Sequence, residues 1–272
     1  MDTLAILGAG KLGEALLSGL LRAGRTIDDI VVTERSAERS AYLKHRYGVN
    51  SVSVEEAVKH GRILIIAVKP QDIGALLTDL GPLVTPDHLV VSVAAGIPTA
   101  YIERMLGEQV PVVRVMPNTP ALVDQAMSAI SAGSHADERH LAATEAILQP
   151  VGKVLRLPEG QQDAVTALSG SGPAYFFYLV EAMIDAGILL GLPRVVAADL
   201  IVQTALGAAT MLRDSGEHPV QLREAVTSPG GTTIAAIREL EKHGVRAALI
   251  AAIEAAAQRS EQLGKLYDGP KP

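Results

Sequence analysis

The sequence predicts an α/β N-terminal half built on a parallel sheet, followed by an all-helical half. Short apolar runs alternate with helical segments up to about residue 158. Beyond that point strand-like runs stop, and Ala- and Leu-rich segments with helical spacing fill the chain. Apolar strands separated by helices are typical of βαβ units, whose parallel sheet is covered on both faces. We therefore expect one domain at 1–158 and a helical one at 159–272.

Five strands are expected in the first half, in the stretches "TLAILGAG", "DDIVVTE", "RILIIAVKP", "HLVVSVAAG" and "VPVVRVMPNTP". The first helix is expected at Lys11–Ala23. The second is expected at 36–47, where Ser36 is a suitable N-cap. After Pro120 the stretches "QAMSAISAG" and "GKVLRLP" are expected as added edge strands that flank a helix at 137–148.

The second half is expected to be helical throughout. Its helices are expected at Asp163–Leu168, Pro173–Leu190, Arg194–Ser215, Val220–Ala225, Gly231–Lys242 and Val245–Tyr267. The most apolar stretch, 174–192, contains Glu181 and Asp185, so a buried helix is expected there rather than a membrane span. A half this apolar exceeds what one subunit can bury, and we expect it to pack against a second copy in a dimer or larger ring.

Composition and charge narrow the classes of function. The chain has 272 residues, a net charge of −6 and no cysteine. The absence of cysteine excludes disulfides, thiolate nucleophiles and Cys-ligated metal centres. The negative charge and the lack of a basic stripe argue against a nucleic-acid partner. The start "MDTLAILGAG" has no basic n-region, so no signal peptide is expected and a cytoplasmic location is favoured.

The stretch "GAGKLG" places Gly8, Gly10 and Gly13 in G-x-G-x-x-G spacing between the first strand and the first helix. In this context the pattern indicates dinucleotide binding, since the glycines allow a tight turn, close approach of a pyrophosphate and packing of the helix. Lys11 and Leu12 belong to the same turn. The fold expected is thus an α/β N-terminal Rossmann-like parallel sheet followed by an all-α dimerisation domain.

The residues after the second strand bear on the choice of cofactor. Glu34 is the acidic residue that typically binds a ribose 2′-hydroxyl, which favours NAD. Arg35 beside it can hold a 2′-phosphate, which favours NADP, and Arg39 adds a second positive charge. Ser36 completes the turn. Both cofactors stay open, with NADP(H) favoured and NAD(H) possible. A solvated helix start is the alternative for the two arginines.

The ends of the later parallel strands face the same crevice. The candidates for cofactor binding there are Ala67, Val68, Lys69, Pro70, Ala95, Gly96, Pro117, Asn118 and Thr119. Lys69 is placed to approach the ribose or a phosphate, although a surface lysine is equally compatible with its position. Asn118 and Thr119 are placed to bind the nicotinamide end. The seven histidines are scattered without metal-ligand spacing, so no metal site is expected.

Two stretches interrupt the helical half. In "ALSGSGPAY", Gly170 and Gly172 are expected to break a helix that restarts at Pro173, and Ser171 is a candidate to contact the substrate. In "TSPGGTT", residues 227–233, a proline and two glycines stand beside four hydroxyl side chains. Such a helix start leaves backbone N–H groups open, for which a carboxylate is the natural guest. An ordinary N-cap is the competing interpretation.

The motifs "GAGKLGEA", "VKP", "VRVMPNTPA", "ALSGSGPAY" and "LREAVTSPGGTTIAAIREL" occur in this order from Leu4 to about Leu266. In these motifs the chain closely resembles the pyrroline-5-carboxylate reductases. The resemblance implies hydride transfer from a nicotinamide cofactor to the C=N carbon of 1-pyrroline-5-carboxylate, which gives L-proline in the last step of proline biosynthesis. It also implies interlaced homodimers through the helical domain, which can assemble further into decamers.

The same resemblance implies roles for site residues. The substrate carboxylate is expected on the loop and helix start Ser228–Thr233, which includes Gly230, Gly231 and Thr232. The Thr233 hydroxyl is expected near the ring nitrogen, as the one catalytic side chain, and Val226 is expected to line the pocket at the subunit interface. Several relatives carry small hydroxyl residues where this chain has Glu34 and Arg35, which leaves the cofactor choice open.

Two other functions are compatible with parts of the pattern. A hydroxyacid dehydrogenase of similar organisation needs a lysine in the helical half as acid or base. The lysines there are Lys242, Lys265 and Lys271, which end a helix or lie near the C-terminus. A nucleotide-binding protein without catalysis is the alternative outside the enzymes, and the intact "SGSGP" and "SPGGTT" stretches argue against it. No membrane partner is expected.

Overall fold

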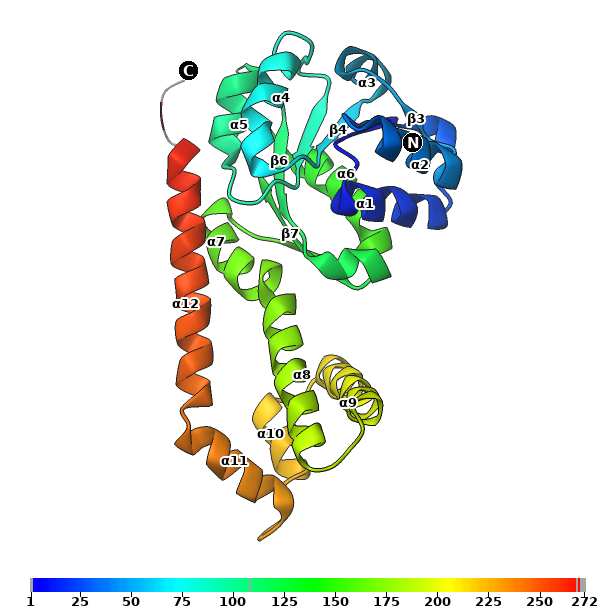
Figure 1. The fold of residues 1–272 in the computed structure, drawn as a ribbon. Helices are drawn as coiled ribbons and strands as arrows, with labels where there is room; N and C mark the ends of the chain where they lie inside the picture. The colour runs from blue at the N-terminus through cyan, green and yellow to red at the C-terminus, as the bar shows by residue number, and fades with distance from the viewer. Residues whose placement is uncertain (1, 108, 268, 270–272) are drawn as a thin grey trace. The chain divides into compact units, whose positions relative to one another are not determined.

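The computed structural model describes residues 2–107, 109–267 and 269, and the chain forms two compact units (Figure 1). One unit consists of Met1–Ser171 with Ala256–Pro272, and the other is Gly172–Ala255. This division by packing differs from the boundary expected after residue 158. Residues 159–171 pack with the sheet, and the end of the last long helix returns to the same unit. Each unit is described below by itself.

The first unit is built on an eight-stranded sheet in the order β3-β2-β1-β4-β5-β6-β7-β8. Its strands are β1 (Leu4–Leu7), β2 (Ile30–Thr33), β3 (Asn50–Ser51), β4 (Ile63–Ile66), β5 (Leu89–Ser92), β6 (Val112–Met116), β7 (Ala126–Ala132) and β8 (Gly152–Arg156). Strands β1 to β6 are parallel, β7 is antiparallel to β6, and β8 is parallel to β7. The expected strands are confirmed, but of the two added strands only β8 lies at the edge, because β7 pairs with both β6 and β8; the short β3 is additional.

Helices cover both faces of this sheet. They are α1 (Lys11–Arg22), α2 (Ala37–Tyr47), α3 (Val54–His60), α4 (Ile73–Leu80), α5 (Thr99–Leu106), α6 (Glu138–Leu148) and α7 (Gln162–Val165). Alternate residues of β1 enter opposite cores: Leu4 and Ile6 pack with α1, α2 and α6, whereas Ala5 and Leu7 pack with α3, α4 and α5. The sheet is therefore buried between two helical layers, which explains its continuous apolar strands.

The chain after α7 continues as a π-helical turn, Thr166–Gly170, rather than breaking. The N–H of Ser171 donates to the carbonyl of Thr166 at 2.8 Å, the five-residue step of this turn. The helix break expected at Gly170 and Gly172 is wrong. Gly170 instead permits a close approach, since a Cβ at that position would lie 2.4 Å from Cε of Met116. The turn thus lies directly on the end of β6.

The second unit contains α8 (Gly172–Leu189), α9 (Arg194–Ser215), α10 (Pro219–Ala225), α11 (Thr232–Lys242) and the first part of α12 (Val245–Gly264). Helices α8 and α9 meet at Gly187, where a Cβ would lie 2.8 Å from that of Ala197. The expected helices of this half are confirmed within a few residues at their ends. The residues from Lys265 to Tyr267 form a short 3₁₀ turn that belongs to the first unit.

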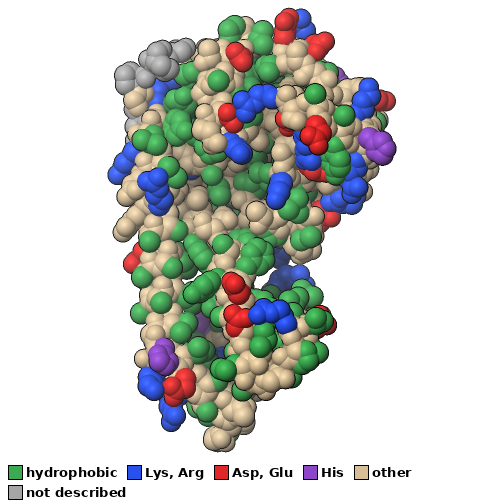
Figure 2. Space-filling model, in the orientation of Figure 1, with side chains coloured by type: hydrophobic (Ala, Val, Ile, Leu, Met, Phe, Trp, Pro, Cys, Tyr) green, Lys and Arg blue, Asp and Glu red, His purple; other side chains and the backbone are tan. Residues whose placement is uncertain are grey.

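The helical unit leaves most of its apolar side chains at the surface, as Figure 2 shows for one face of the molecule. Phe176, Phe177, Leu189 and Val195 are all more than two-thirds exposed. The burial expected for 174–192 is therefore wrong for the single chain, since α8 packs on α9 along one side only. Among the residues that the structure describes, two helices, Glu159–Leu189 and Arg194–Ser215, are long and apolar enough to cross a membrane by length and composition.

Candidate active site

The turn between β1 and α1 has the geometry that a dinucleotide-binding turn needs. Gly8 adopts a φ of +95°, and a Cβ there would lie 2.8 Å from a methyl of Val68. A Cβ on Gly13 would lie 2.4 Å from the carbonyl oxygen of Gly8, so only glycine lets α1 pack on the turn. A Cβ on Gly10 would meet nothing within 4 Å. In dinucleotide-binding turns a pyrophosphate approaches the backbone at the second glycine, and the space at Gly10 is open for such an approach.

The start of α1 is suited to phosphate groups. Its N-cap is Gly10, and no side chain within the described ranges caps it. The first N–H groups of a helix lack intrahelical partners and lie at the positive end of its dipole. A phosphate at this helix start would supply the missing acceptors. The residues present therefore fit the pyrophosphate of a nicotinamide dinucleotide.

One cavity lies on the β2 side of this turn. It has a volume of about 510 Å³, and we call it the Arg35 cavity. Its lining comprises Gly8, Gly10, Thr33, Glu34, Arg35, Val52, Ser53, Val54, Ala67, Val68, Lys69, Gln71, Asp72, Ala75, Leu76 and Asp79. The cavity adjoins β1, β2 and β4, where the strand order reverses and where dinucleotides bind in this sheet topology. It brings together the expected residues after β2 with those after β4.

Two polar contacts organise the charged residues of the Arg35 cavity. Glu34 Oε1 accepts a hydrogen bond from the N–H of Ser36 at 3.0 Å. The guanidinium of Arg35 forms an ion pair with Asp72, with 3.0 Å between nitrogen and oxygen. Ser36 caps α2 as expected, because its hydroxyl oxygen accepts from the N–H of Arg39. The acidic and basic residues after β2 thus both have protein partners.

Arg39 does not line the Arg35 cavity but braces the glycine turn from the side of α2. Its Nε donates to the carbonyl of Ala9 at 3.0 Å, and its guanidinium also pairs with Glu14 of α1. Glu14 further accepts hydrogen bonds from Tyr42 and Tyr47. Burial raises the pKa of Glu14, but the hydrogen bonds from Arg39 and the two tyrosines outweigh it and hold the pKa below 4.5.

A second cavity lies on the other side of the turn. It has a volume of about 270 Å³, and we call it the Asn118 cavity. Its lining comprises Lys11, Leu12, Ala15, Val93, Ala95, Met116, Pro117, Asn118, Thr119, Ala121, Leu122 and Gly170. The two cavities therefore flank the α1 start, the arrangement that the two halves of a dinucleotide require. Of the expected cofactor residues, Lys11, Leu12, Ala95, Pro117, Asn118 and Thr119 lie here.

The side chain of Asn118 links three segments at the edge of this cavity. Its Nδ2 donates to the carbonyl and the hydroxyl of Ser169 at 3.2 and 3.3 Å. Its Oδ1 accepts from the N–H of Met127 at 2.9 Å. Asn118 therefore fixes the π-helical turn against β7 and the end of β6. Its direct contact with a nicotinamide stays a prediction.

A third cavity, of about 290 Å³, lies beside the ends of β4 and β5 and is lined by the C-terminal part of α12. Pro70, Gly96 and Ser171, all expected at the site, line it together with Ala95, Thr166, Ala256, Arg259, Ser260, Leu263, Leu266 and Tyr267. Tyr267 closes one end, since its hydroxyl donates to the carbonyl of Pro70 at 3.3 Å. The end of α12 is therefore part of the wall beside the crevice.

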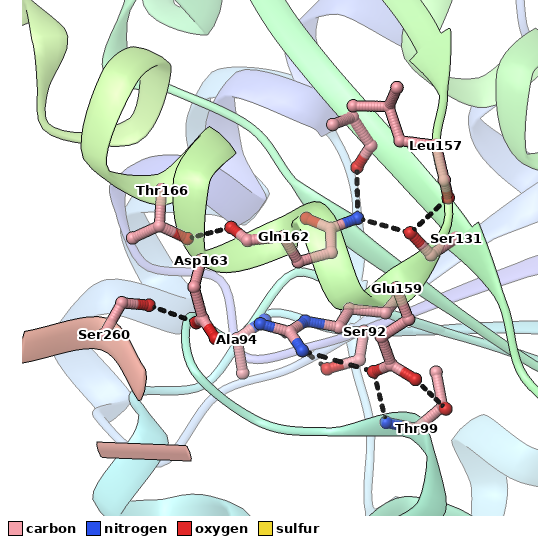
Figure 3. A network of polar contacts seen from close by, with 12 residues as sticks. Ser92, Ala94, Thr99, Ser131, Leu157, Glu159, Gln162, Asp163, Thr166 and Ser260 are labelled. Atoms are coloured by element: carbon pink, nitrogen blue, oxygen red, sulfur yellow. Dashed lines mark hydrogen bonds and ion pairs between the residues drawn. The ribbon is translucent and has the colours of Figure 1, made fainter. Parts of the chain in front are cut away.

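A polar network under the π-helical turn anchors α7 to the sheet (Figure 3). Glu159 accepts from the N–H and the hydroxyl of Thr99 at 2.8 and 2.5 Å and pairs at 3.2 Å with Arg114, whose side chain is buried in β6. Gln162 donates to the hydroxyl of Ser131 at 2.8 Å, and Asp163 accepts from Ser260 of α12 at 2.6 Å. These contacts hold residues 159–171 in the first unit.

The loop 226–231 and the start of α11 lie in the second unit. Helix α11 begins at Thr232 with Gly231 as N-cap, and no side-chain cap is present in the described residues. The N–H of Gly231 donates to the carbonyl of Ser228 at 3.1 Å, so it is already engaged. The N–H groups of Thr232 and Thr233 are left in the first turn. Val226 is exposed, and Pro229 lies before the helix rather than in its first turn.

Several residues of the Arg35 and Asn118 cavities were not predicted from the sequence. Gln71, Asp72 and Asp79 follow β4 on a 3₁₀ turn and α4, which carry no recognisable motif. Their position two to ten residues after "AVK" is the only signal that could have placed them near the strand end. Met116 and Gly170 line the Asn118 cavity because the π-helical turn reaches it, a contact between segments far apart in sequence.

Comparisons with known proteins cover the whole site. A family model described as pyrroline-5-carboxylate reductase dimerisation matches residues 159–263. A second model, described as NADP oxidoreductase coenzyme F420-dependent, matches residues 3–96. The chain is 46% identical over 286 residues to a pyrroline-5-carboxylate reductase of Mycobacterium tuberculosis, with 97% of each chain covered.

Solved structures agree with the curated relative. A pyrroline-5-carboxylate reductase of Coxiella burnetii matches with a TM-score of 0.90 at 36% identity, covering 96% of this chain and 98% of that one. A Plasmodium falciparum pyrroline carboxylate reductase with NADP bound matches with a TM-score of 0.88 at 30% identity, covering 97% and 98%. Sequence motifs, dinucleotide turn, helical unit and relatives all agree, and the chain belongs to the pyrroline-5-carboxylate reductase family.

Proposed function

We propose that the chain reduces 1-pyrroline-5-carboxylate to L-proline, with NADPH favoured as the hydride donor and NADH also accepted. The observation that carries this proposal is the turn at Gly10, with open space and an uncapped helix start between two cavities. The near full-length similarity to reductases of this substrate supports the choice of reaction. The NADP in the Plasmodium falciparum relative supports the cofactor.

The first unit binds the cofactor in this proposal. Gly8, Gly10 and Gly13 shape the turn, and the N–H groups that begin α1 bind the pyrophosphate. The Arg35 cavity takes the adenosine half, with Glu34, Arg35, Ser36 and Lys69 near the ribose. The Asn118 cavity takes the nicotinamide half, bounded by Ala95 and Pro117–Thr119. When bound, the reduced nicotinamide supplies the hydride.

The second unit carries the loop and helix start that bind the substrate carboxylate in this proposal, whereas Ser171 belongs to the first unit. The free N–H groups of Thr232 and Thr233 and the hydroxyl of Ser228 bind the carboxylate, with Gly230 and Gly231 giving it access to the backbone. Ser171 and Val226 are the further contacts proposed with the ring. A carboxylate at a helix start gains both hydrogen bonds and the favourable dipole. Binding through the carboxylate fixes the orientation of the ring for hydride transfer to its C=N carbon.

The reduction needs little acid–base machinery. The nitrogen of a cyclic imine is basic enough to be protonated, and hydride addition to the carbon of this iminium ion gives the amine. The Thr233 hydroxyl orients the ring nitrogen by accepting its N–H as it changes from imine to amine. The main contributions of the protein are near-attack positioning and exclusion of water. This agrees with a site built from glycines and hydroxyls rather than from histidine and carboxylate.

Self-association and location complete the proposal. The family model that matches residues 159–263 describes a dimerisation region. The exposed apolar faces of α8 and α9 are suited to a second copy of the chain. We therefore propose a homodimer through the helical unit, and a cytoplasmic enzyme in which these helices face protein rather than lipid. A decamer of such dimers is the larger assembly in line with the resemblance.

The test is the initial rate of NADPH and NADH oxidation by the purified protein, with and without pyrroline-5-carboxylate. Substrate-dependent oxidation that is faster with NADPH is expected. Cofactor binding without substrate-dependent oxidation would favour the nucleotide-binding alternative and overturn the reductase. Faster oxidation with NADH would retain the reaction and reverse the cofactor preference.

A further inference from the structure

Any phosphate that reaches Arg35 must compete with a carboxylate that already pairs with it. The guanidinium that can bind a 2′-phosphate already pairs with Asp72 at 3.0 Å, across the cavity from β2. The two residues come from different elements: Arg35 follows β2, whereas Asp72 ends the 3₁₀ turn Pro70–Asp72 after β4. Both line the Arg35 cavity. The ion pair therefore lies within the space that the adenosine ribose would use.

The two partners differ in exposure and in backbone support. The Arg35 side chain is 84% exposed, whereas that of Asp72 is 28% exposed. The N–H of Asp72 donates to the carbonyl of Lys69 at 2.9 Å, and Asp72 leads directly into α4. The carboxylate of Asp72 is thus carried on fixed backbone, and the long Arg35 side chain comes to it. Asp72 determines where the guanidinium rests.

The other charges of the cavity reinforce this arrangement. Glu34 and Asp79 add two acidic groups against Arg35 and Lys69. Glu34 also occupies the N–H of Ser36 at 3.0 Å, a donor at the start of α2 that an anion would otherwise use. A 2′-phosphate brings a charge of about −1.5 to −2 into this setting. A ribose 2′-hydroxyl brings none and can donate to Glu34.

We propose that Asp72 is a specificity-determining residue that lowers the preference for NADPH over NADH by competing with the 2′-phosphate for Arg35. NADPH must draw the guanidinium away from Asp72, whereas NADH leaves the ion pair intact. Asp72 acts through Arg35 and is in this sense a positioning residue. The inference rests on the proposed function only in that the ligand of the cavity is a nicotinamide dinucleotide.

The direct test measures binding of the adenosine half alone by titration calorimetry. Adenosine 2′,5′-bisphosphate carries the 2′-phosphate, and 5′-AMP lacks it. Asp72→Asn is expected to tighten binding of the bisphosphate about fivefold relative to 5′-AMP, the upper range for an exposed ion pair. Arg35→Ala is expected to weaken the bisphosphate selectively. In the Arg35→Ala background, Asp72→Asn is expected to change the ratio less than about twofold, because the pair is already absent.

Asp79→Asn is the matched control, since it removes the same charge from the same cavity while the ion pair of Arg35 to Asp72 remains. An equal gain from Asp79→Asn, or an undiminished gain in the Arg35→Ala background, would mean general charge repulsion and overturn the role of the pair. An unchanged ratio in Asp72→Asn would also overturn it. Failure of both probes to bind the wild type would refute the cavity assignment itself.

Kinetics provide a second readout. The ratio of kcat/KM for NADPH to that for NADH is expected to rise about fivefold in Asp72→Asn through KM, with kcat unchanged. The calorimetric test measures binding of the two adenosine probes, so it gives a result even if the protein has no reductase activity. The failure of the reductase function and the failure of the Asp72 inference are therefore distinguishable.

Discussion

At the scale of single residues, the three glycines of the first turn differ in the space that a side chain would have. Gly8 and Gly13 have protein atoms where a Cβ would stand, so their substitution disturbs the fold. Gly10 has open space there. A methyl at Gly10 therefore leaves the folded protein intact and occupies the path of the pyrophosphate. A substitution at Gly10 therefore tests cofactor binding alone, whereas a substitution at Gly8 or Gly13 also disturbs folding.

Gly10→Ala is expected to raise KM for both NADPH and NADH by about tenfold or more, because the added methyl overpacks the bound state only. The thermal unfolding midpoint is expected to stay within the error of the wild type. Gly160→Ala is the control, because its Cβ also meets nothing within 4 Å but Gly160 lies outside the three cavities. Normal cofactor KM values in Gly10→Ala would contradict the pyrophosphate assignment.

Thr233 is the residue on which the substrate side of the proposal depends. Thr233→Ala is expected to lower kcat/KM for pyrroline-5-carboxylate about tenfold or more, the worth of a hydrogen bond to a charged group. Cofactor binding is expected to be unchanged. Thr233→Ser keeps the hydroxyl and is expected to restore most of the activity. Wild-type kinetics in Thr233→Ala would contradict the proposal that the Thr233 hydroxyl orients the ring nitrogen.

At the scale of elements, α1 and α2 are joined through Glu14, and the same contacts support the glycine turn. Arg39 bonds both Glu14 and the carbonyl of Ala9. The charged carboxylate is the form that accepts from Arg39, Tyr42 and Tyr47, which is why the pKa of Glu14 in the fold lies below 4.5. A lowered pKa stabilises the fold above the unfolded-state value, and this stability is lost as the pH falls through the lowered one.

Glu14→Gln is expected to lower the free energy of unfolding by about 1 kcal/mol at neutral pH. As the pH falls from 4.5 through the lowered pKa of Glu14, the difference from the wild type is expected to shrink, because the folded wild-type carboxylate becomes protonated over this range. Urea unfolding of the wild type and of Glu14→Gln, from neutral pH into the acid range, measures this difference in the free energy of unfolding. Glu55→Gln, which breaks an exposed pair with Lys59, is the control and is expected to have a smaller effect. A difference that persists unchanged in acid would contradict the electrostatic origin.

The elements also show how far sequence reasoning reaches. The buried strands and the glycine turn were predictable because their signals are local: apolar runs and a fixed glycine spacing. The π-helical turn was not, since Gly170 reads as a break unless its close contact with Met116 is known. The pairing of Arg35 with Asp72 was equally hidden, because it joins the ends of two strands across a cavity. The contacts that could not be predicted from the sequence were those between segments far apart along the chain.

At the scale of the whole molecule, the apolar surface of the helical unit is the feature on which the proposed dimer rests. Side chains such as Phe177 and Leu189 are large and exposed in the single chain. Contiguous apolar patches of this kind mark interaction surfaces in soluble proteins. The dimerisation description of the matching family model agrees with this interpretation.

Phe177→Asp is expected to reduce the mass in sedimentation velocity to that of a single chain and to abolish reductase activity, because a charge at an apolar interface is left without a partner. Val123→Asp is the control, since Val123 and Phe177 are both 69% exposed but Val123 lies in the first unit. It is expected to keep the wild-type mass. A Phe177→Asp protein with wild-type mass and activity would exclude α8 from the interface.

The return of the last residues to the first unit has a consequence for the order of synthesis. The hydroxyls of Ser260 and Tyr267 bond Asp163 and Pro70, which emerge from the ribosome long before them. Between the two stages the apolar helices of 172–255 are made. The first unit therefore receives its last segment only after residues 172–255 have been made, unlike an ordinary N-terminal domain. The third cavity, beside the ends of β4 and β5, thus gains its α12 wall at the last stage of synthesis.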